Sequence, residues 1–230
     1  MSSCFRKEIT ACWIACTVVL FATAASAQQH PPRQIAGRTL QQWAQDLDDS
    51  NEIVQARAAK MLGLFGAQAV PVLKQCLNHS SEAVRYWACS HLGDLAPRGD
   101  QTLVERLNQL KNDAKHPACA LAAAYALCRI EGPKGHIQLL IQRLDHGEPG
   151  MAIAACDFLG RLGPQAKAAV PALERTARTF YAKVRRHIHR VYHVDRAAEN
   201  ALRQIDPQWK RSWPDPRQRR NRPRKPRSRR

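Results

Sequence analysis

The chain has 230 residues, of which 44% are hydrophobic, so it is long enough for one or two domains with a buried core. Its formal net charge is +17, but residues 208–230 contribute +10 of this through eleven Lys or Arg and one Asp, while residues 28–207 contribute only +6. Because most of the charge lies outside the part that can form a core, it does not indicate a basic nucleic-acid-binding domain.

Residues 1–27 have the pattern of a signal peptide. Arg6 and Lys7 precede an apolar run, and Ala25-Ser26-Ala27 has the small-x-small arrangement that signal peptidase accepts. We therefore expect an exported protein, periplasmic or secreted, with no membrane span after cleavage, and a short linker over residues 28–38. The alternative is a retained anchor, although the uncharged run over residues 9–28 barely reaches the ~20 residues that a spanning helix needs.

The segment GRTLQQWAQDL, residues 37–47, has a helical pattern. Leu40, Trp43 and Leu47 share one face, and Thr39 stands in the N-cap position. We expect this helix to cover the first repeat, with Trp43 buried.

Five ten-residue windows then align, with an apolar residue at position one, alanine at position five and leucine at position nine. These positions lie on one face of a helix, and a spacing of 30 to 43 residues between windows is typical of a solenoid. The windows start at Val54, Val84, Cys119, Met151 and Val194. Asp49 and Glu52 have the spacing of a capping box before the first window. No strand is predicted.

A second helical pattern follows each of the first four windows, so each unit is predicted to be a helical hairpin. AVPVL at 69–73 and AVPAL at 169–173 are interpreted as corners, where Pro71 and Pro171 occupy the first turn of the second helix. Gly66 and Gly163 precede them and are expected to form left-handed caps of the first helices. In the last window, Glu199 and Arg203 replace the small residues of the inner units, which predicts that no further repeat packs there.

Two of these motifs resemble a known family. VRYWACSHLG at 84–93 and GAQAVPVL at 66–73 are similar to HEAT repeats of the short bacterial type, also called PBS-lyase-type or armadillo-like repeats. The resemblance implies an all-α fold, a right-handed α-solenoid of about five HEAT-like helical hairpins over residues 39–207. It also implies a non-enzymatic scaffold that binds another protein.

No residue pattern indicates a catalytic, cofactor-binding or metal site. Five of the eight cysteines lie outside residues 1–27, and the repeat register allows only Cys76 and Cys89 to form a disulfide. His189 and His193 have metal-binding spacing, but Arg185 and Arg196 share their face and oppose a cation. We expect no cofactor and no small-molecule substrate.

Basic residues gather in a predicted amphipathic helix over 178–193 and in the Arg/Pro-rich segment 208–230, which is predicted to be disordered. The pattern leaves open whether the chain turns near residues 176–179 or near 193–195. Two hypotheses follow: an unknown protein partner binds the groove of the solenoid, or an anionic polymer, nucleic acid or acidic polysaccharide, binds the basic residues. The contacts expected for such a polymer are Arg178, Arg185, Arg186, Arg190, Lys210, Arg211, Arg219 and Arg220.

Overall fold

The computed structural model describes residues 33–145, 148–184 and 193–213, and the chain divides into two units between Thr39 and Leu40. The described part of the first unit is an antiparallel hairpin of β1 (Gln34–Ile35) and β2 (Arg38–Thr39). Ala36 and Gly37 form its turn with φ of 51° and 75°, the backbone of a tight two-residue hairpin. This hairpin lies largely within the predicted linker, residues 28–38, and the prediction of no strand is wrong here, because a local turn can pair two short segments without any apolar alternation. Residues 1–32, with the predicted signal peptide, lie outside the described residues.

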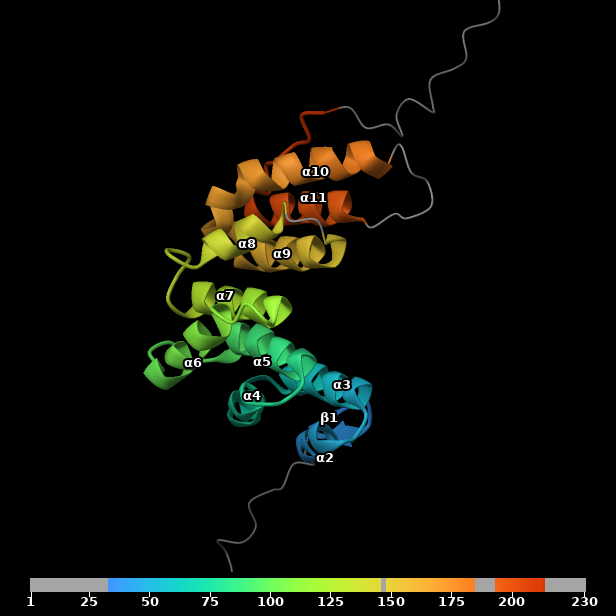
Figure 1. The fold of residues 1–230 in the computed structure, drawn as a ribbon, viewed down its shortest axis with the longest axis vertical. Coiled ribbons are helices and arrows are strands. Elements are labelled where there is room, and N and C mark those ends of the chain that lie inside the picture. The colour runs from blue at the N-terminus through green and yellow to red at the C-terminus, as the bar shows by residue number, and fades with distance from the viewer. Residues whose placement is uncertain (1–32, 146–147, 185–192, 214–230) are drawn as a thin grey trace, which may run out of the picture. The chain divides into compact units, whose positions relative to one another are not determined.

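The second unit contains helices and turns throughout its described residues (Figure 1). Its α-helices are α2 (Leu40–Gln45), α3 (Glu52–Leu62), α4 (Val70–Cys76), α5 (Glu82–Leu95), α6 (Gln101–Lys111), α7 (Pro117–Ile130), α8 (Ile137–Arg143), α9 (Pro149–Leu162), α10 (Val170–Val184) and α11 (Val194–Ile205). Three 3₁₀ helices lie between them: η2 (Asp46–Asp48), η3 (Gly63–Ala69) and η4 (Gly163–Ala169). Trp43 is buried, as predicted.

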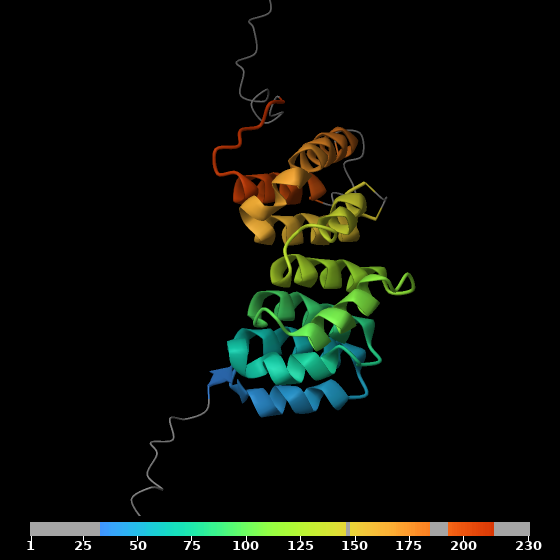
Figure 2. The same cartoon turned by 90° about the vertical axis from the view of Figure 1, so that its left-hand side faces the viewer.

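The five predicted windows coincide with α3, α5, α7, α9 and α11. The alanine at position five and the leucine at position nine are fully buried in every one of them. These helices form one row in which each packs against the next, and Figure 2 shows the helices of this unit following one another in chain order. The prediction of an all-α solenoid is therefore confirmed.

The helices pair differently from the prediction. α2 packs on α3, α4 mainly on α5, α6 on α7 and α10 on α11, while α8 contacts both α7 and α9. Four helix pairs are therefore distinct, α2–α3, α4–α5, α6–α7 and α10–α11, whereas α8 packs against the helices on both sides of it in the chain. The helix predicted over residues 37–47 was expected to cover the first repeat. It corresponds to α2, which pairs with α3. The period of the apolar pattern gives the spacing of the helices but does not indicate which neighbour each helix packs against.

The two corners contain both predicted prolines, and each also contains a 3₁₀ helix that was not predicted. Pro71 and Pro171 lie in the first turns of α4 and α10, as predicted. Gly66 and Gly163 have positive φ, 67° and 59°, but their ψ values of −142° and −138° differ from those of a left-handed helical cap. Gly163 ends α9 as its C-cap, as predicted in position, whereas Gly66 lies inside η3, and both corners continue as 3₁₀ helices.

The N-cap of α3 also differs from the predicted capping box. Asn51 is the N-cap, and its side-chain oxygen accepts a hydrogen bond from the Ile53 N–H at 2.9 Å. Asp49 accepts from the Asn51 N–H at 2.7 Å. Asp49 therefore orders the residues before α3. Asn51 accepts from one of the first-turn N–H groups of α3, which have no partner within the helix.

The structure of the last hairpin excludes one of the two predicted positions for the turn of the chain. α10 is continuous from Val170 to Val184, so the chain does not turn near residues 176–179. Residues 185–192, which are half of the predicted basic helix, lie outside the described residues, and α11 begins at Val194.

Residues 208–213 pack on this hairpin. The Trp209 indole N–H donates to Glu174 at 2.9 Å, and Arg178 donates to the Ser212 hydroxyl at 2.9 Å. The Trp209 and Trp213 rings lie 5.8 Å apart. The prediction that disorder begins at residue 208 is wrong for this segment, because two tryptophans supply apolar area that a count of aliphatic side chains leaves out. Residues 214–230 lie outside the described residues.

Candidate interaction groove

The N-terminal turns of α5, α7 and α9 line a groove of about 370 Å³. Its volume lies within the lower part of the range for binding pockets. The lining is largely apolar, with a single charged side chain: Glu82, Ala83, Tyr86, Trp87, Ala118, Gly150, Met151 and Ala154. Tyr86, Trp87, Met151 and Ala154 lie within the predicted windows, the other four lie just before them, and none was predicted to belong to a site.

The groove exists because small residues stand where three neighbouring helices begin. Ala118 belongs to α7, which lies between α5 and α9 (Figure 1). Gly150 is the second residue of α9, and a Cβ atom added to it would meet no other atom within 4 Å. The small residues therefore leave a space, and the larger Tyr86, Trp87 and Met151 border it.

An aromatic cluster adjoins the groove and holds its walls. The Tyr86 ring lies 5.3 Å from the Trp87 ring and 5.9 Å from the Phe158 ring, measured between centroids. The Phe158 ring stacks on that of Tyr125 at 4.6 Å. Burial, followed by the nearby Asp157, raises the pKa of the Tyr86 hydroxyl, which therefore stays protonated at neutral pH. Tyr86 and Trp87, the two members of the cluster that line the groove, supply aromatic contact area of the kind that dominates binding at protein interfaces.

Arg161 connects the two outer helices of the groove. It extends from α9 to α5, where it donates to the Ser90 hydroxyl at 3.0 Å and pairs with Asp94. Its guanidinium lies 4.5 Å from the centre of the Tyr125 ring, and the Tyr125 hydroxyl also donates to Asp94. Because these contacts fix α5 against both α7 and α9, the groove is held in shape without a ligand.

Glu82 gives the groove a negative edge. Its carboxylate accepts a long hydrogen bond, 3.4 Å, from the Cys119 backbone N–H in the first turn of α7. A helix N-terminus carries unpaired N–H groups and a partial positive charge, so a carboxylate is stabilised there. Within the described part of the chain only Oε1 of Glu82 makes a hydrogen bond, so the second oxygen can accept from a bound group.

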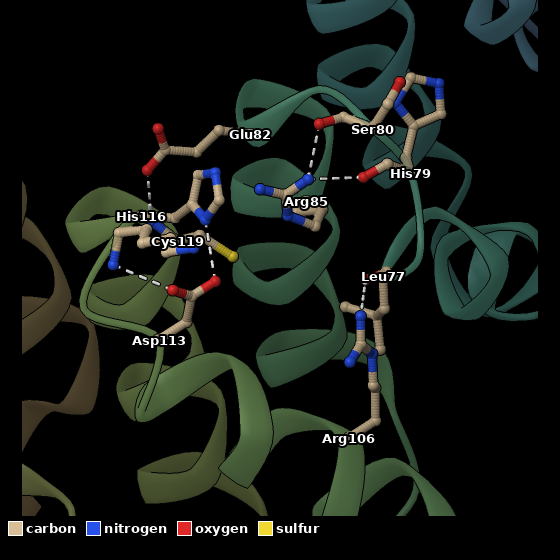
Figure 3. Close-up of polar contacts among 10 residues, drawn as sticks. Leu77, His79, Ser80, Glu82, Arg85, Arg106, Asp113, His116 and Cys119 are labelled. Atoms are coloured by element: carbon tan, nitrogen blue, oxygen red, sulfur yellow. Dashed lines mark hydrogen bonds and ion pairs between the residues drawn. The ribbon is translucent and has the colours of Figure 1, made fainter.

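A buried arginine lies behind this edge (Figure 3). The Arg85 side chain, only 8% exposed, donates to the backbone oxygens of His79 and Ser80 at 2.6 and 2.7 Å. Figure 3 also shows the sulfur of Cys119 on the side of Arg85. Among the described residues Arg85 forms no ion pair with a carboxylate, so its charge is balanced by backbone carbonyl groups.

Comparison with known proteins identifies the repeats. The family model described as HEAT repeats matches residues 40–127, which contain α2 to α6 and most of α7. Residues 40–127 therefore contain HEAT repeats. The same window pattern and the same buried alanine and leucine recur in α9 and α11, beyond the matched residues.

No curated protein matches the chain. A crystal structure of an engineered protein matches with 19% identity and a TM-score of 0.39, covering 73% of this chain and 79% of its own. HEAT repeats generally mediate protein–protein interaction and are typically non-enzymatic.

The basic residues predicted to contact an anionic polymer have different surroundings in the structure. Arg211 pairs with Glu199 and its side chain is only 18% exposed, so it stabilises the fold. Arg178 is more exposed, lies 5.0 Å from the centre of the Trp213 ring and donates to Ser212. Lys210 is exposed. The other five lie outside the described residues: Arg185, Arg186, Arg190, Arg219 and Arg220.

The described residues contain no group of three His, Cys, Asp or Glu side chains arranged to bind a metal. His189 lies outside them, so the predicted His189 and His193 pair has no described geometry. None of the helices in the described part of the chain is long and apolar enough to cross a membrane.

Proposed function

We propose that this protein is an exported, non-enzymatic scaffold that binds a protein partner in the groove of α5, α7 and α9. The observation that carries the proposal is a preformed, largely apolar groove with two aromatic side chains and one carboxylate, on successive helices of the solenoid of which α5 and most of α7 lie in the matched HEAT repeats. The pattern of residues 1–27 supports export.

The lining indicates the kind of segment that fits. An apolar side chain of the partner would pack against Tyr86, Trp87 and Met151, which gives a desolvated central contact. A lysine or arginine next to it would pair with the Glu82 carboxylate. The partner is therefore a polypeptide with an apolar anchor flanked by a basic residue, complementary in charge to the groove.

The test uses the chain from residue 28 onward and a matched pair of variants. Ala83→Arg places a long, charged side chain in the groove, whereas Gln138→Arg adds the same charge at an exposed position of α8. Proteins captured from the exported fraction are identified, and each is then purified and titrated against wild type and both variants. A groove partner loses at least about tenfold in affinity with Ala83→Arg, a change of ~1.4 kcal/mol, and keeps its affinity with Gln138→Arg.

A partner that binds Ala83→Arg as tightly as wild type overturns the groove assignment. Salt and truncation separate the alternative, an anionic polymer bound by the basic residues. Such a polymer is lost at ~0.3 M salt and on deletion of residues 214–230, because its affinity comes from screened charge contacts. A groove partner survives both, since most of its contact is apolar.

A further inference from the structure

Two cysteines meet at the interface of α5 and α7. Cys89 on α5 and Cys119 on α7 are both fully buried, and their thiols lie within hydrogen-bonding reach of each other. All five cysteines among the described residues are free. The structure therefore places the Cys119 thiol beside the Cys89 thiol, a pair that the repeat register did not predict.

The two helices approach closely at this interface. Gly93 lies one turn after Cys89 on α5, and a Cβ atom added to it would come within 2.9 Å of the Ala126 Cα on α7. Residues 119, 122, 123 and 126 on the facing helix are Cys or Ala, so no large side chain separates the backbones. A disulfide needs Cα atoms about 4.4 to 6.8 Å apart, and a close contact between helices with small residues is where that separation is found.

The surroundings make the two thiols unequal. The hydrogen bond from Cys89 and the charge of the Arg85 guanidinium lower the pKa of the Cys119 thiol, although burial opposes them. Burial raises the pKa of Cys89, so Cys89 keeps its proton and donates it toward Cys119. Elsewhere, burial raises the pKa of Cys76 to about 11 and those of Cys128 and Cys156 to about 12. Cys119 is therefore the thiol most easily ionised, and the thiolate is the reactive form.

We propose that Cys89 and Cys119 form an interhelical disulfide in the presence of a disulfide oxidant, with Cys119 attacking first and Cys89 resolving. The Cys119 thiolate attacks one sulfur of a low-molecular-mass disulfide, which forms a mixed disulfide and releases one thiolate. Cys89 then loses its proton and attacks the Cys119 sulfur, which forms the Cys89–Cys119 bond and releases the second thiolate. Two protein thiols are oxidised and one oxidant disulfide is reduced to two thiols.

The bond joins two helices that line the groove. Glu82 and Ala83 precede Cys89 on α5, and Ala118 directly precedes Cys119 on α7. The disulfide closes a loop that contains α6, and cross-linking of the unfolded chain stabilises the folded state. The oxidised protein therefore has a higher thermal midpoint than the reduced one, independently of whether the groove binds a partner.

The experiment treats the native chain from residue 28 onward with oxidised glutathione, blocks the remaining thiols after denaturation, and maps the linked peptides by mass spectrometry. The expected result is one bond, Cys89 to Cys119, with three thiols still reactive. Cys89→Ser is expected to trap glutathione on Cys119, and Cys156→Ser is the control that forms the same bond as wild type. A Cys76–Cys89 bond, five reactive thiols at every oxidant ratio, or glutathione trapped elsewhere in Cys89→Ser would overturn the proposal.

The role of Arg85 is measured by the pH dependence of the oxidation rate. Arg85→Gln removes the charge beside Cys119, so the rise of the rate with pH is expected to move to higher pH than in wild type. Arg85→Lys keeps a positive charge and is expected to restore the profile toward wild type. A profile that is the same in wild type and Arg85→Gln would overturn the activation of Cys119 by Arg85, whereas glutathione trapped elsewhere in Cys89→Ser would overturn Cys119 as the attacking thiol.

Discussion

Glu199 on α11 and Arg211, twelve residues later, form an ion pair in which both side chains are largely withdrawn from solvent. Arg203 pairs with the other Glu199 oxygen at 3.2 Å. Glu199 occupies the helix face where inner repeats carry small residues and a neighbouring helix. The segment around Arg211 covers this face, so the solenoid ends against its own chain.

Replacing Arg211 by Ala is expected to lower the free energy of unfolding by about 1–3 kcal/mol, because the buried Glu199 carboxylate loses one of its two partners. Lys210→Ala is the matched control, since Lys210 is the preceding residue and exposed. It is expected to change stability by no more than ~0.5 kcal/mol. Urea denaturation followed by circular dichroism measures both, and equal stabilities would show that the ion pair is unimportant.

Two truncations test whether residues 208–213 belong to the folded unit. A chain ending at Trp213 is expected to keep the thermal midpoint of the full chain, although it loses most of the +10 charge of residues 208–230. A chain ending at Pro207 also loses the contacts of Trp209 with Glu174 and of Arg211 with Glu199, and its midpoint is expected to fall by several degrees. Identical midpoints would contradict the described contacts.

Among the repeat positions, replacement of the leucine at position nine by alanine is expected to lower the free energy of unfolding most. Leu127→Ala removes a fully buried side chain and is expected to cost ~2–5 kcal/mol of unfolding free energy. Leu64→Ala is the control, because Leu64 is 51% exposed in the η3 corner, and its cost is expected to be below ~1 kcal/mol. Similar costs at the two positions would be inconsistent with the repeat register.

Stability is expected to fall between pH 7 and pH 5 partly because of His91. Burial, followed by the Arg161 charge, lowers the pKa of His91, whose ring stacks on Trp87. As pH drops below about 6.5, the unfolded state binds a proton at this position before the folded state does, so the unfolded state is favoured. Denaturation midpoints across this range measure the slope. His91→Gln is expected to reduce it and the exposed His193→Gln to leave it unchanged, and an unchanged slope in His91→Gln would contradict the pKa direction.

The repeat architecture could be predicted from the sequence because it depends on one short-range periodicity. Alanine at position five and leucine at position nine recur wherever a helix faces its neighbours, and the structure buries all ten of these side chains. Pro71 and Pro171 also marked helix starts correctly, since proline is favoured in a first turn whatever surrounds it.

The pairing of helices, the groove and the cysteine pair were decided by tertiary structure. Periodicity is the same whichever neighbour a helix packs against, so it could not show that α4 pairs with α5. The groove brings together Tyr86, Ala118 and Met151 from three repeats, which no local pattern relates. Cys89 and Cys119 belong to different windows and different register positions, and only the close approach of α5 to α7 brings their thiols together. Local order follows from the sequence through backbone and side-chain preferences, whereas contacts between repeats depend on how whole helices stack.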